Sequence, residues 1–352
     1  MNEILGKPVA VGDIAKELKK LWEADEAATN ASLMNFAIYS EQTGSLERNA
    51  GAIQSLTREH ACRAILVEME REAPEAKAEA WITAQCHLAH GKKSVCCEQL
   101  AFLLKGKAIG RMRNTVFSNL GSDLPLVFWW QGELSELFEE RLYRIMDRLI
   151  VDSSEWCDLA SGFGKIRSAV NDSRCLMAVQ DLEWTRCFHF RLAVASLFDD
   201  PIAQESLPSI KHVTIGGDKV HRSCQLMFTS WLATQAGWTL SEMRPDGCVF
   251  TTDSRQVEVT FLNEGEAPLT QVELSDGQTT ISVRRQKDAP HLDLALLAEG
   301  HEVRQVAPAD PLDQVELVAE QLSRGGKNSL FRSTWPMLFQ MIGMEKGEPL
   351  CA

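Results

Sequence analysis

Three short segments carry residue types that could bind a small molecule. Gly216-Gly217-Asp218 is predicted to join a strand to a helix, where backbone amides can hold a phosphate group. The segment lacks the Lys-Ser/Thr of a P-loop, and Asp218 would repel an anion. Asp152-Ser153-Ser154 could coordinate a ligand, but it is also typical of a helix N-cap, the interpretation that we favour. Gly162-Phe163-Gly164-Lys165 resembles half of a dinucleotide fingerprint, yet no predicted strand precedes it and we interpret it as a loop.

No combination of residues in the chain specifies an enzyme active site. There is no Gly-x-Ser-x-Gly nucleophile motif, and the 8 histidines are scattered without a His-x-x-x-His pair. Metal-binding spacing is missing too, because no Cys-x-x-Cys occurs and Cys187-Phe188-His189 has no second pair nearby. We therefore predict no catalytic residues, no metal site and no cofactor.

The cysteines are predicted to be reduced. There are 10 of them in 352 residues, far below the density of a secreted disulfide scaffold. Cys62 and the adjacent Cys96-Cys97 lie in apolar runs, where cysteine behaves as a small hydrophobic residue. Because no secretory signal is visible at the N-terminus, we predict a cytoplasmic protein with free thiols. A redox role for Cys96-Cys97 or for Cys351 stays open.

Charge and hydropathy argue against nucleic-acid and membrane partners. The chain has 36 Lys and Arg against 49 Asp and Glu, a net charge of −13, so its overall field repels phosphate backbones and anionic lipids. The strongest apolar run is residues 125–130, far shorter than the ~18 residues of a membrane-spanning helix. A composition of 45% hydrophobic and 24% charged residues is ordinary for a globular protein.

The elements that must position these segments fall into two predicted domains. Residues 1–155 alternate strand-like and helix-like segments, which predicts an α/β domain with a mostly parallel sheet and flanking helices. The predicted strands are 32–39, 62–69, 81–88, 95–104, 124–130 and 148–151, and the predicted helices are 10–28, 46–59, 109–120 and 134–146. The pair of strands within 81–104 is predicted to be antiparallel and to lie at the sheet edge.

Residues 156–352 are predicted to form an α+β domain with an antiparallel meander. A helical section over 156–207 comes first, and two C-terminal helices within 308–345 come last. Between them, 208–307 holds a strand at 213–215, a helix at 220–236 and five short strands at 248–252, 256–262, 269–274, 279–284 and 291–297. Asp246-Gly247 and Asp276-Gly277 are typical hairpin connections.

Trp129 and Trp130 end the most hydrophobic predicted strand. Adjacent residues of a strand point to opposite faces, so one indole could enter the core while the other faces a cleft or an interface. The commoner arrangement places both in the core. The competing hypothesis makes one of them a recognition anchor, because aromatic residues dominate interface hot spots.

Seven segments of the chain, taken in order, carry a resemblance to a known family. The segments are Met34-Asn35-Phe36-Ala37-Ile38-Tyr39, His60-Ala61-Cys62-Arg63-Ala64-Ile65, Cys97-Glu98-Gln99-Leu100, 122–130, 147–153, Asp181-Leu182-Glu183-Trp184-Thr185-Arg186 and the predicted helix at 226–238. As an ordered set they are similar to the glucose-6-phosphate dehydrogenase assembly proteins (OpcA family). The similarity runs from about residue 30 to 240; no single motif is diagnostic, and 248–307 gives no match.

The resemblance implies a non-catalytic partner that promotes assembly or activation of glucose-6-phosphate dehydrogenase, the enzyme that makes NADPH in the oxidative pentose phosphate pathway. We expect it to act by binding the active, oligomeric state of that enzyme more tightly than the inactive state. The predicted partner-binding residues are Trp129, Trp130, Asp152, Ser153, Trp184 and Arg186.

Two other functions stay open. One is an enzyme or sensor that binds a sugar phosphate or nucleotide in a cleft at the carboxyl edge of the N-terminal sheet, lined by Gly216-Gly217 or Asp152-Ser153. The other is a scaffold for a different metabolic enzyme.

Overall fold

A computed structural model describes residues 4–23, 28–30, 32–89, 93–111, 114, 118–121, 123–172, 176–253, 255–324 and 329–344. The chain divides into two compact units, each built around its own β-sheet. The first unit is Met1–Val151 with Arg167–Gln180 and Val318–Gly325, and the second is Asp152–Ile166, Asp181–Leu317 and Gly326–Ala352. The chain first passes between units beside the domain boundary predicted near residue 155.

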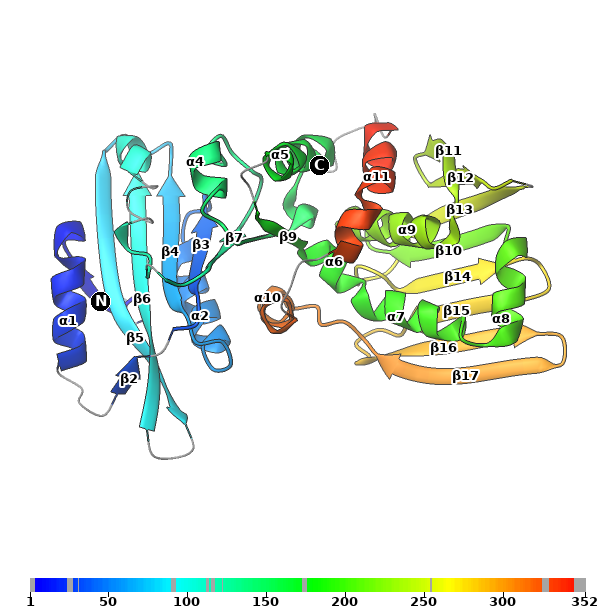
Figure 1. The fold of residues 1–352 in the computed structure, drawn as a ribbon, viewed down its shortest axis with the longest axis horizontal. Helices are drawn as coiled ribbons and strands as arrows, with labels where there is room; N and C mark the ends of the chain where they lie inside the picture. The colour runs from blue at the N-terminus through cyan, green and yellow to red at the C-terminus, as the bar shows by residue number, and fades with distance from the viewer. Residues whose placement is uncertain are drawn as a thin grey trace. The chain divides into compact units, whose positions relative to one another are not determined.

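The first unit holds a nine-stranded sheet whose central strands are parallel (Figure 1). Its order is β1-β5-β6-β4-β3-β7-β8-β9, and β2 pairs with β6. The neighbours from β6 through β4, β3 and β7 to β8 are all parallel, which confirms the predicted α/β fold. The strands are β1 (Lys7–Val9), β2 (Ala28–Asn30), β3 (Asn35–Ser40), β4 (Arg63–Glu70), β5 (Lys77–Ala89), β6 (Lys93–Lys105), β7 (Leu126–Trp130), β8 (Arg148–Val151) and β9 (Ala178–Asp181).

The middle of this sheet is fully buried. Every residue of β3 and β7 is buried, which explains their continuous apolar sequence, since a strand covered on both faces needs no polar alternation. Helix α2 (Ser45–Leu56) packs on β4, burying Ala50 and Ile53. Helix α1 (Ile14–Glu23) contacts β5 (Figure 1).

Helices predicted in this unit are corrected in length. The helix predicted over 10–28 is α1 over Ile14–Glu23, preceded by the 3-10 turn η1 (Val11–Asp13), and strand β2 begins at Ala28. The helix predicted over 134–146 is reduced to α4 (Glu140–Tyr143), because Glu139 has extended backbone. Part of the helix predicted over 109–120 lies outside the described residues, and its first residues belong to the 3-10 helix η2 (Gly106–Arg111).

The hairpin of β5 and β6 overturns part of the thiol prediction. Cys86 and Cys96 face each other in the antiparallel register and are disulfide-bonded. The hairpin register brings these two cysteines together, and their spacing in the sequence does not predict this pairing. Cys97 is buried and is not part of a disulfide, and Cys351 lies outside the described residues. The hairpin is also not the sheet edge, because β6 pairs with β4 and β1 pairs with β5.

The second unit holds an eight-stranded sheet of order β11-β12-β13-β10-β14-β15-β16-β17. All neighbours are antiparallel except β10 and β13, so the predicted antiparallel domain is confirmed with one parallel pair. The strands are β10 (His212–Gly217), β11 (Thr239–Arg244), β12 (Gly247–Thr251), β13 (Gln256–Asn263), β14 (Gln271–Ser275), β15 (Thr280–Arg285), β16 (His291–Ala298) and β17 (His301–Pro308).

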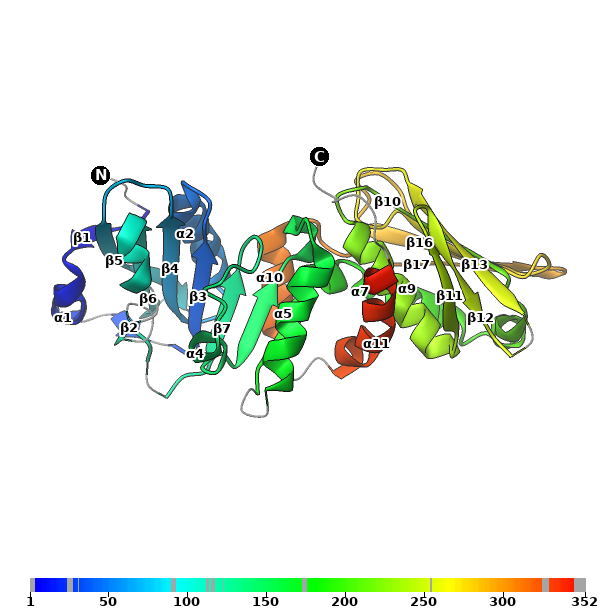
Figure 2. The same ribbon diagram turned by 90° about the horizontal axis from the view of Figure 1, so that it is seen from above.

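Helices of the second unit cover one face of this sheet (Figure 2). α7 (Phe188–Leu197) packs on β15, β16 and β17, α9 (Arg222–Ala236) packs on β10, and α11 (Ser329–Met344) packs on β11 and α9. Alternating strand residues such as Val283 and Leu294 are buried. The helices and 3-10 turns of this part of the chain are η3 (Ser153–Glu155), α5 (Leu159–Asn171), α6 (Leu182–Arg186), α7 (Phe188–Leu197), α8 (Pro201–Ser206), η4 (Leu207–Ser209), α9 (Arg222–Ala236), α10 (Gln314–Ser323) and α11 (Ser329–Met344).

Three further predictions are corrected here. The section predicted to be helical over 156–207 contains strand β9, which is only four residues long. Strands β11 and β17 were not predicted, because most of their residues are exposed and no apolar alternation marks them. Gly162-Phe163-Gly164-Lys165 lies inside α5 rather than in a loop, and Gly162 of this helix gives room for the ring of Trp156.

Among the described residues, we find no helix with the length and apolar character that crossing a bilayer requires.

Candidate functional site

All six residues predicted to bind a partner lie in the interior of their units, with exposed fractions of 0% to 7%. Trp129 and Trp130 follow the commoner of the two arrangements, since both are in the core. The Trp130 ring lies 4.2 Å from the Tyr39 ring, and its Nε1 donates to the Glu133 carbonyl at 3.0 Å. The Trp129 Nε1 has no hydrogen-bond partner. Their partner-binding role stays a prediction.

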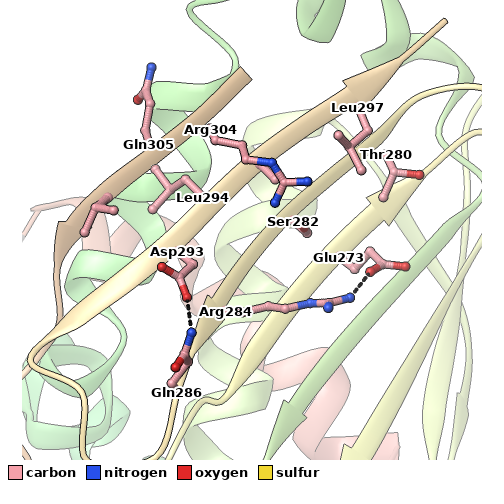
Figure 3. A pocket seen from close by; sticks show the side chains of 12 residues that line it. Glu273, Thr280, Ser282, Arg284, Gln286, Asp293, Leu294, Leu297, Arg304 and Gln305 are labelled. Atoms are coloured by element: carbon pink, nitrogen blue, oxygen red, sulfur yellow. Dashed lines mark hydrogen bonds and ion pairs between the residues drawn. The ribbon is translucent and has the colours of Figure 1, made fainter. Parts of the chain in front are cut away.

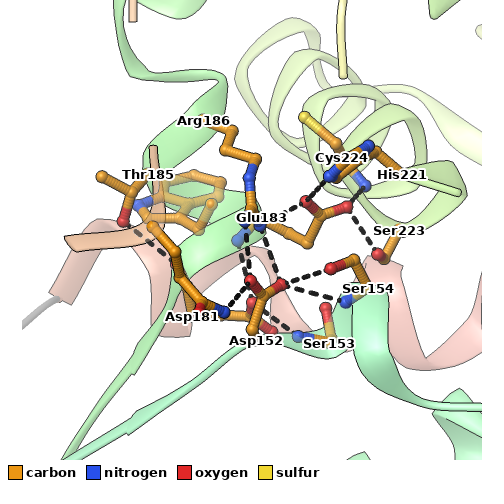
Figure 4. Close-up of polar contacts among 12 residues, drawn as sticks. Asp152, Ser153, Ser154, Asp181, Glu183, Thr185, Arg186, His221, Ser223 and Cys224 are labelled. Carbon is orange, nitrogen blue, oxygen red and sulfur yellow. Dashed lines mark hydrogen bonds and ion pairs between the residues drawn. The ribbon is translucent and has the colours of Figure 1, made fainter. Parts of the chain in front are cut away.

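Three of the other four predicted residues, Asp152, Ser153 and Arg186, gather in the second unit around one ion pair (Figure 4). Arg186 donates to both oxygens of Asp152, from Nη1 at 2.8 Å and from Nη2 at 2.6 Å. Ser154 donates to Asp152 through its backbone amide and its hydroxyl, so the N-cap interpretation of this segment is confirmed. Gln314 adds a further donor to Asp152 at 2.9 Å. Such a bidentate pair fixes the side chains on both sides of it, although the buried Nε of Arg186 has no hydrogen-bond partner.

Two more carboxylates lie beside this pair. Asp181 ends β9 and caps α6 by accepting from the Glu183 amide at 3.0 Å, and it also accepts from the Ser153 amide. Glu183 is completely buried and accepts from Arg186 Nη1 at 2.8 Å. We call Asp152, Asp181, Glu183, Arg186 and His221 the buried charge cluster. The sequence analysis missed Asp181, Glu183 and His221 as members.

Glu183 fills the N-terminus of α9. Its Oε2 accepts from the Ser223 hydroxyl at 2.7 Å and from the Cys224 amide at 2.9 Å (Figure 4). His221 lies 3.9 Å from the Glu183 Oε1 and bonds Asp218 at 2.9 Å. The positive end of the helix dipole is therefore neutralised by a carboxylate of the chain itself.

Burial sets the protonation of the cluster. Burial, together with the charges of Asp152 and Glu183, raises the pKa of Asp181 to about 8, so this carboxyl is neutral at physiological pH. Burial opposes the charge of Asp152, yet the bonds from Arg186 hold its pKa below the ordinary value. Burial likewise opposes the charge of His221, but Asp218 and Glu183 raise its pKa. Burial raises the pKa of Glu183, although the charges of Arg186 and His221 oppose that shift.

Trp184 lies in an aromatic stack rather than at a surface. Its ring centroid is 5.0 Å from that of Phe331 and 3.5 Å from the guanidinium carbon of Arg191. Arg191 is itself buried and donates to the Trp184 carbonyl at 2.8 Å. The stack connects α6 to α7 and α11.

The first unit contains a comparable helix N-terminus. Glu68 of β4 accepts from the Gly44 amide and from the Leu46 amide, each at 2.8 Å, and from the Ser45 hydroxyl at 3.1 Å. These donors begin α2 at the carboxyl end of β3, where a phosphate would bind in an open parallel sheet. Because Glu68 is buried and takes these donors, the residues do not fit a phosphate group here.

The glycines of Gly216-Gly217-Asp218 are also committed to the fold. A Cβ on Gly217 would lie 2.2 Å from the Pro268 carbonyl oxygen, so this glycine allows two backbone segments to approach closely. Asp218 accepts from the His221 amide at 2.8 Å and caps the entry to α9. The Asp218 amide donates to the Ala267 carbonyl at 3.0 Å, so neither this amide nor that of His221 is open to an anion. Among the described residues, no group of three or more His, Cys, Asp and Glu side chains is arranged to hold a metal ion.

These features define a two-unit α/β and α+β protein in which the N-termini of α2 and α9 are filled by carboxylates of the chain itself. The family models for the N-terminal and C-terminal domains of the "glucose-6-phosphate dehydrogenase subunit" match residues 53–168 and 177–335. The chain belongs to this family, the OpcA glucose-6-phosphate dehydrogenase assembly proteins. The resemblance drawn from the sequence is thereby confirmed.

Two curated relatives support this membership. Both are described as "Putative OxPP cycle protein OpcA". The relative from Synechocystis is 21% identical over 84% of this chain and 67% of its own length. The relative from Synechococcus elongatus is 24% identical over 72% of this chain and 62% of its own length. The chain thus spans about two thirds of the length of these relatives.

Two solved structures are similar to this chain at low identity. The 3-ketoreductase KijD10 from Actinomadura kijaniata has a TM-score of 0.48 at 10% identity, covering 88% of this chain and 96% of that chain. The putative oxidoreductase yvaA from Bacillus subtilis has a TM-score of 0.47 at 9% identity, covering 89% and 96%. At these values the likeness says nothing about what this chain does.

Proposed function

We propose that this chain is a non-catalytic, cytoplasmic partner of glucose-6-phosphate dehydrogenase that favours the active oligomeric state of that enzyme in the oxidative pentose phosphate pathway. The observation that carries the proposal is the family match over both halves of the chain. The filled N-termini of α2 and α9 support a role without phosphate chemistry of its own. The net charge of −13 supports a protein partner over nucleic acid or an anionic membrane.

Activation by a partner requires a difference in affinity. A protein that binds two states of the dehydrogenase equally well shifts nothing, however tightly it binds. A preference of ~100-fold for the active state corresponds to about 2.7 kcal/mol. A few buried contacts at an interface can supply that difference.

We propose that the six predicted residues support the partner-binding surface from inside. Arg186 holds the η3 turn to α6 through Asp152 and Glu183, and Trp184 stacks on Phe331. A surface that rests on such fixed elements is preorganised, which reduces the entropy lost on binding. Trp129 and Trp130 play the same part in the first unit, where they anchor the end of β7.

The test measures the rate of glucose-6-phosphate dehydrogenase from the same organism against substrate concentration, with and without this purified chain. The chain alone is the blank. We expect a saturable rise in rate, or a fall in apparent KM, at near-stoichiometric addition. Unchanged kinetics together with separate elution in size exclusion would overturn the proposal.

A variant pair tests the supporting role of the cluster. Arg186→Met removes the buried cation, and Arg244→Met removes an exposed one whose side chain is 41% accessible. We expect the concentration that gives half-maximal activation to rise several-fold for Arg186→Met and to stay unchanged for Arg244→Met. Equal activation by folded samples of both variants would remove the cluster from the binding mechanism.

A thermal-shift screen with glucose 6-phosphate, NADP and nucleotides tests the competing ligand-binding function, and we expect no stabilisation.

A further inference from the structure

The face of the second sheet that its helices leave open carries an ordered pattern of charge (Figure 3). A shallow hollow of about 720 Å³ lies over β14, β15, β16 and β17. Its lining includes two arginines, Arg284 and Arg304, and two carboxylates, Glu273 and Asp293. Within the chain, Arg284 pairs with Glu273 and Arg304 pairs with Glu302, which lies on the same face of β17. With Glu302 included these side chains carry a formal charge of −1, small against the −13 of the whole chain, so a second acidic chain could approach this face with little repulsion.

The strand register fixes where these charges lie. Glu273 of β14 is paired across the sheet with Ser282 of β15, and Ala295 of β16 is paired with Arg304 of β17. Ser282 and Ala295 are themselves paired, so these four residues form one row with Glu273 and Arg304 at its ends. Arg284 and Asp293 are opposite each other in the next row. Both rows point away from the helices, because the intervening residues Val283 and Leu294 are buried.

This pattern is complementary to itself under one rotation. A two-fold axis parallel to the strands, between β15 and β16, exchanges β14 with β17 and β15 with β16. In a face-to-face pair, Glu273 of one copy then meets Arg304 of the other, and Arg284 meets Asp293. Each contact occurs twice, as in any isologous interface. At the centre, Ser282 meets Ala295, and both are small enough for the sheets to approach.

We propose that this face is an interface between two copies of the chain, related by that two-fold axis. The rotation overlays only β14 to β17, and strand spacing gives the outward face of these four strands about 430 Å², roughly half of the ~800 Å² that each partner contributes to a standard interface, so a weak dimer is expected. The exposed apolar side chains Leu297 and Val306 lie in the same hollow and would be covered. The proposal does not depend on the proposed function.

The first measurement is the mass of the full chain by analytical ultracentrifugation over roughly a hundredfold range of concentration. We expect the mass to rise from 39.2 kDa towards twice that value. Glu273→Arg places arginine against Arg304 of the second copy, and Arg304→Glu places glutamate against Glu273. Each variant is expected to weaken association at least ~10-fold, because like charges oppose each other twice. Gln204→Arg on exposed α8 is the matched control and should associate like the unchanged chain.

Mixing the two variants gives the decisive outcome. In a mixed pair, the arginine introduced by Glu273→Arg in one chain meets the glutamate introduced by Arg304→Glu in the other. The remaining Arg304 and Glu273 keep their attraction, so dimers should return. Circular dichroism establishes that each variant is folded.

Three results would overturn the proposal. They are a chain that stays at 39.2 kDa at every concentration, variants that remain dimeric, and a mixture that stays monomeric. Loss of dehydrogenase binding by Glu273→Arg in a monomeric chain would assign the face to that enzyme instead.

Discussion

At the N-termini of both α2 and α9, a buried carboxylate accepts hydrogen bonds from backbone amides, but the carboxylate at α9 also bonds an arginine. Each helix follows a strand, and each receives a buried carboxylate from another element at its positive end. At α2, Glu68 accepts only from Gly44, Ser45 and Leu46, all within one turn of chain. At α9, Glu183 also accepts from Arg186 and lies near His221.

Glu68 is therefore a local helix cap, whereas Glu183 is a junction between several elements. Glu68 secures one helix on one sheet. Glu183 joins α9 to α6 and, through Arg186, to Asp152 at η3, so several elements share the same buried charges. A buried network of this kind costs desolvation and is stable only while every member keeps its partner. The two sites are therefore expected to respond differently to substitution.

The largest effect is expected for Arg186→Met. The variant leaves Asp152 and Glu183 buried without their cation, which is expected to lower the free energy of unfolding by about 3–5 kcal/mol. Urea unfolding followed by fluorescence measures the change. Arg244→Met, which breaks only exposed pairs, should cost less than ~1 kcal/mol. Similar losses of unfolding free energy for Arg186→Met and Arg244→Met would show that the buried ion pairs of Arg186 stabilise the fold no more than surface ion pairs do.

A smaller effect is expected for Glu68→Gln at the local cap. The amide keeps one acceptor oxygen and places an N–H₂ group against the donors of α2, at a cost of about 2–3 kcal/mol. The same unfolding experiment measures it, with Glu59→Gln on the exposed side as the control. A loss as large as that of Arg186→Met would contradict the distinction drawn between cap and junction.

The glycines before α2 and α9 provide a second comparison between the two helix N-termini. Gly217 is required because a Cβ would meet the Pro268 carbonyl at 2.2 Å, so Gly217→Ala should cost about 2 kcal/mol and asparagine should not rescue it. Gly44 has a φ of +77° with open space around it, so Gly44→Asn should cost below ~0.5 kcal/mol, since asparagine tolerates this conformation. Thermal melts of the three variants would be compared. A tolerated asparagine at 217 would disprove the close approach.

The smallest effect concerns pH. The pKa of Asp181, about 8 in the folded chain, exceeds its unfolded value of 3.8, so the folded state holds the extra proton. The stability from this group is complete below the unfolded pKa and is lost as pH rises through 8. Between pH 7 and pH 9 the unchanged chain should lose roughly 1.4 kcal/mol more than Asp181→Asn does. The exposed control Asp246→Asn should behave like the unchanged chain, and identical slopes for all three would contradict the assignment.

The sequence predicted what depends on local pattern. The continuous apolar run of β7 and the Asp276-Gly277 turn between β14 and β15 were found because burial and turn chemistry leave a local signature. Strand β9 was missed because four residues are too short for periodicity to show, and the exposed β17 carries no apolar alternation.

The members of the charge cluster could not be predicted for a different reason. Glu183 and Ser223, or Asp152 and Arg186, are far apart in the sequence and meet only in the folded chain. A buried glutamate in a short helix has the same types of residue around it in the sequence as a solvent-exposed one, so the sequence does not distinguish the two. The ordered family segments contained Asp181, Glu183 and Arg186, but nothing local indicated that they share one set of bonds. The Cys86–Cys96 disulfide escaped notice because it depends on hairpin register.

The central place of β10 has a consequence for synthesis on the ribosome. This strand is the first of its sheet to emerge, yet its two neighbours, β13 and β14, are made later. Until residue 275 has left the exit tunnel, β10 has at least one edge of unpaired backbone amides and carbonyls, a template for pairing with another chain. A transcript cut short after β13 would therefore release an aggregation-prone product, whereas one ending after β14 would have both edges of β10 closed.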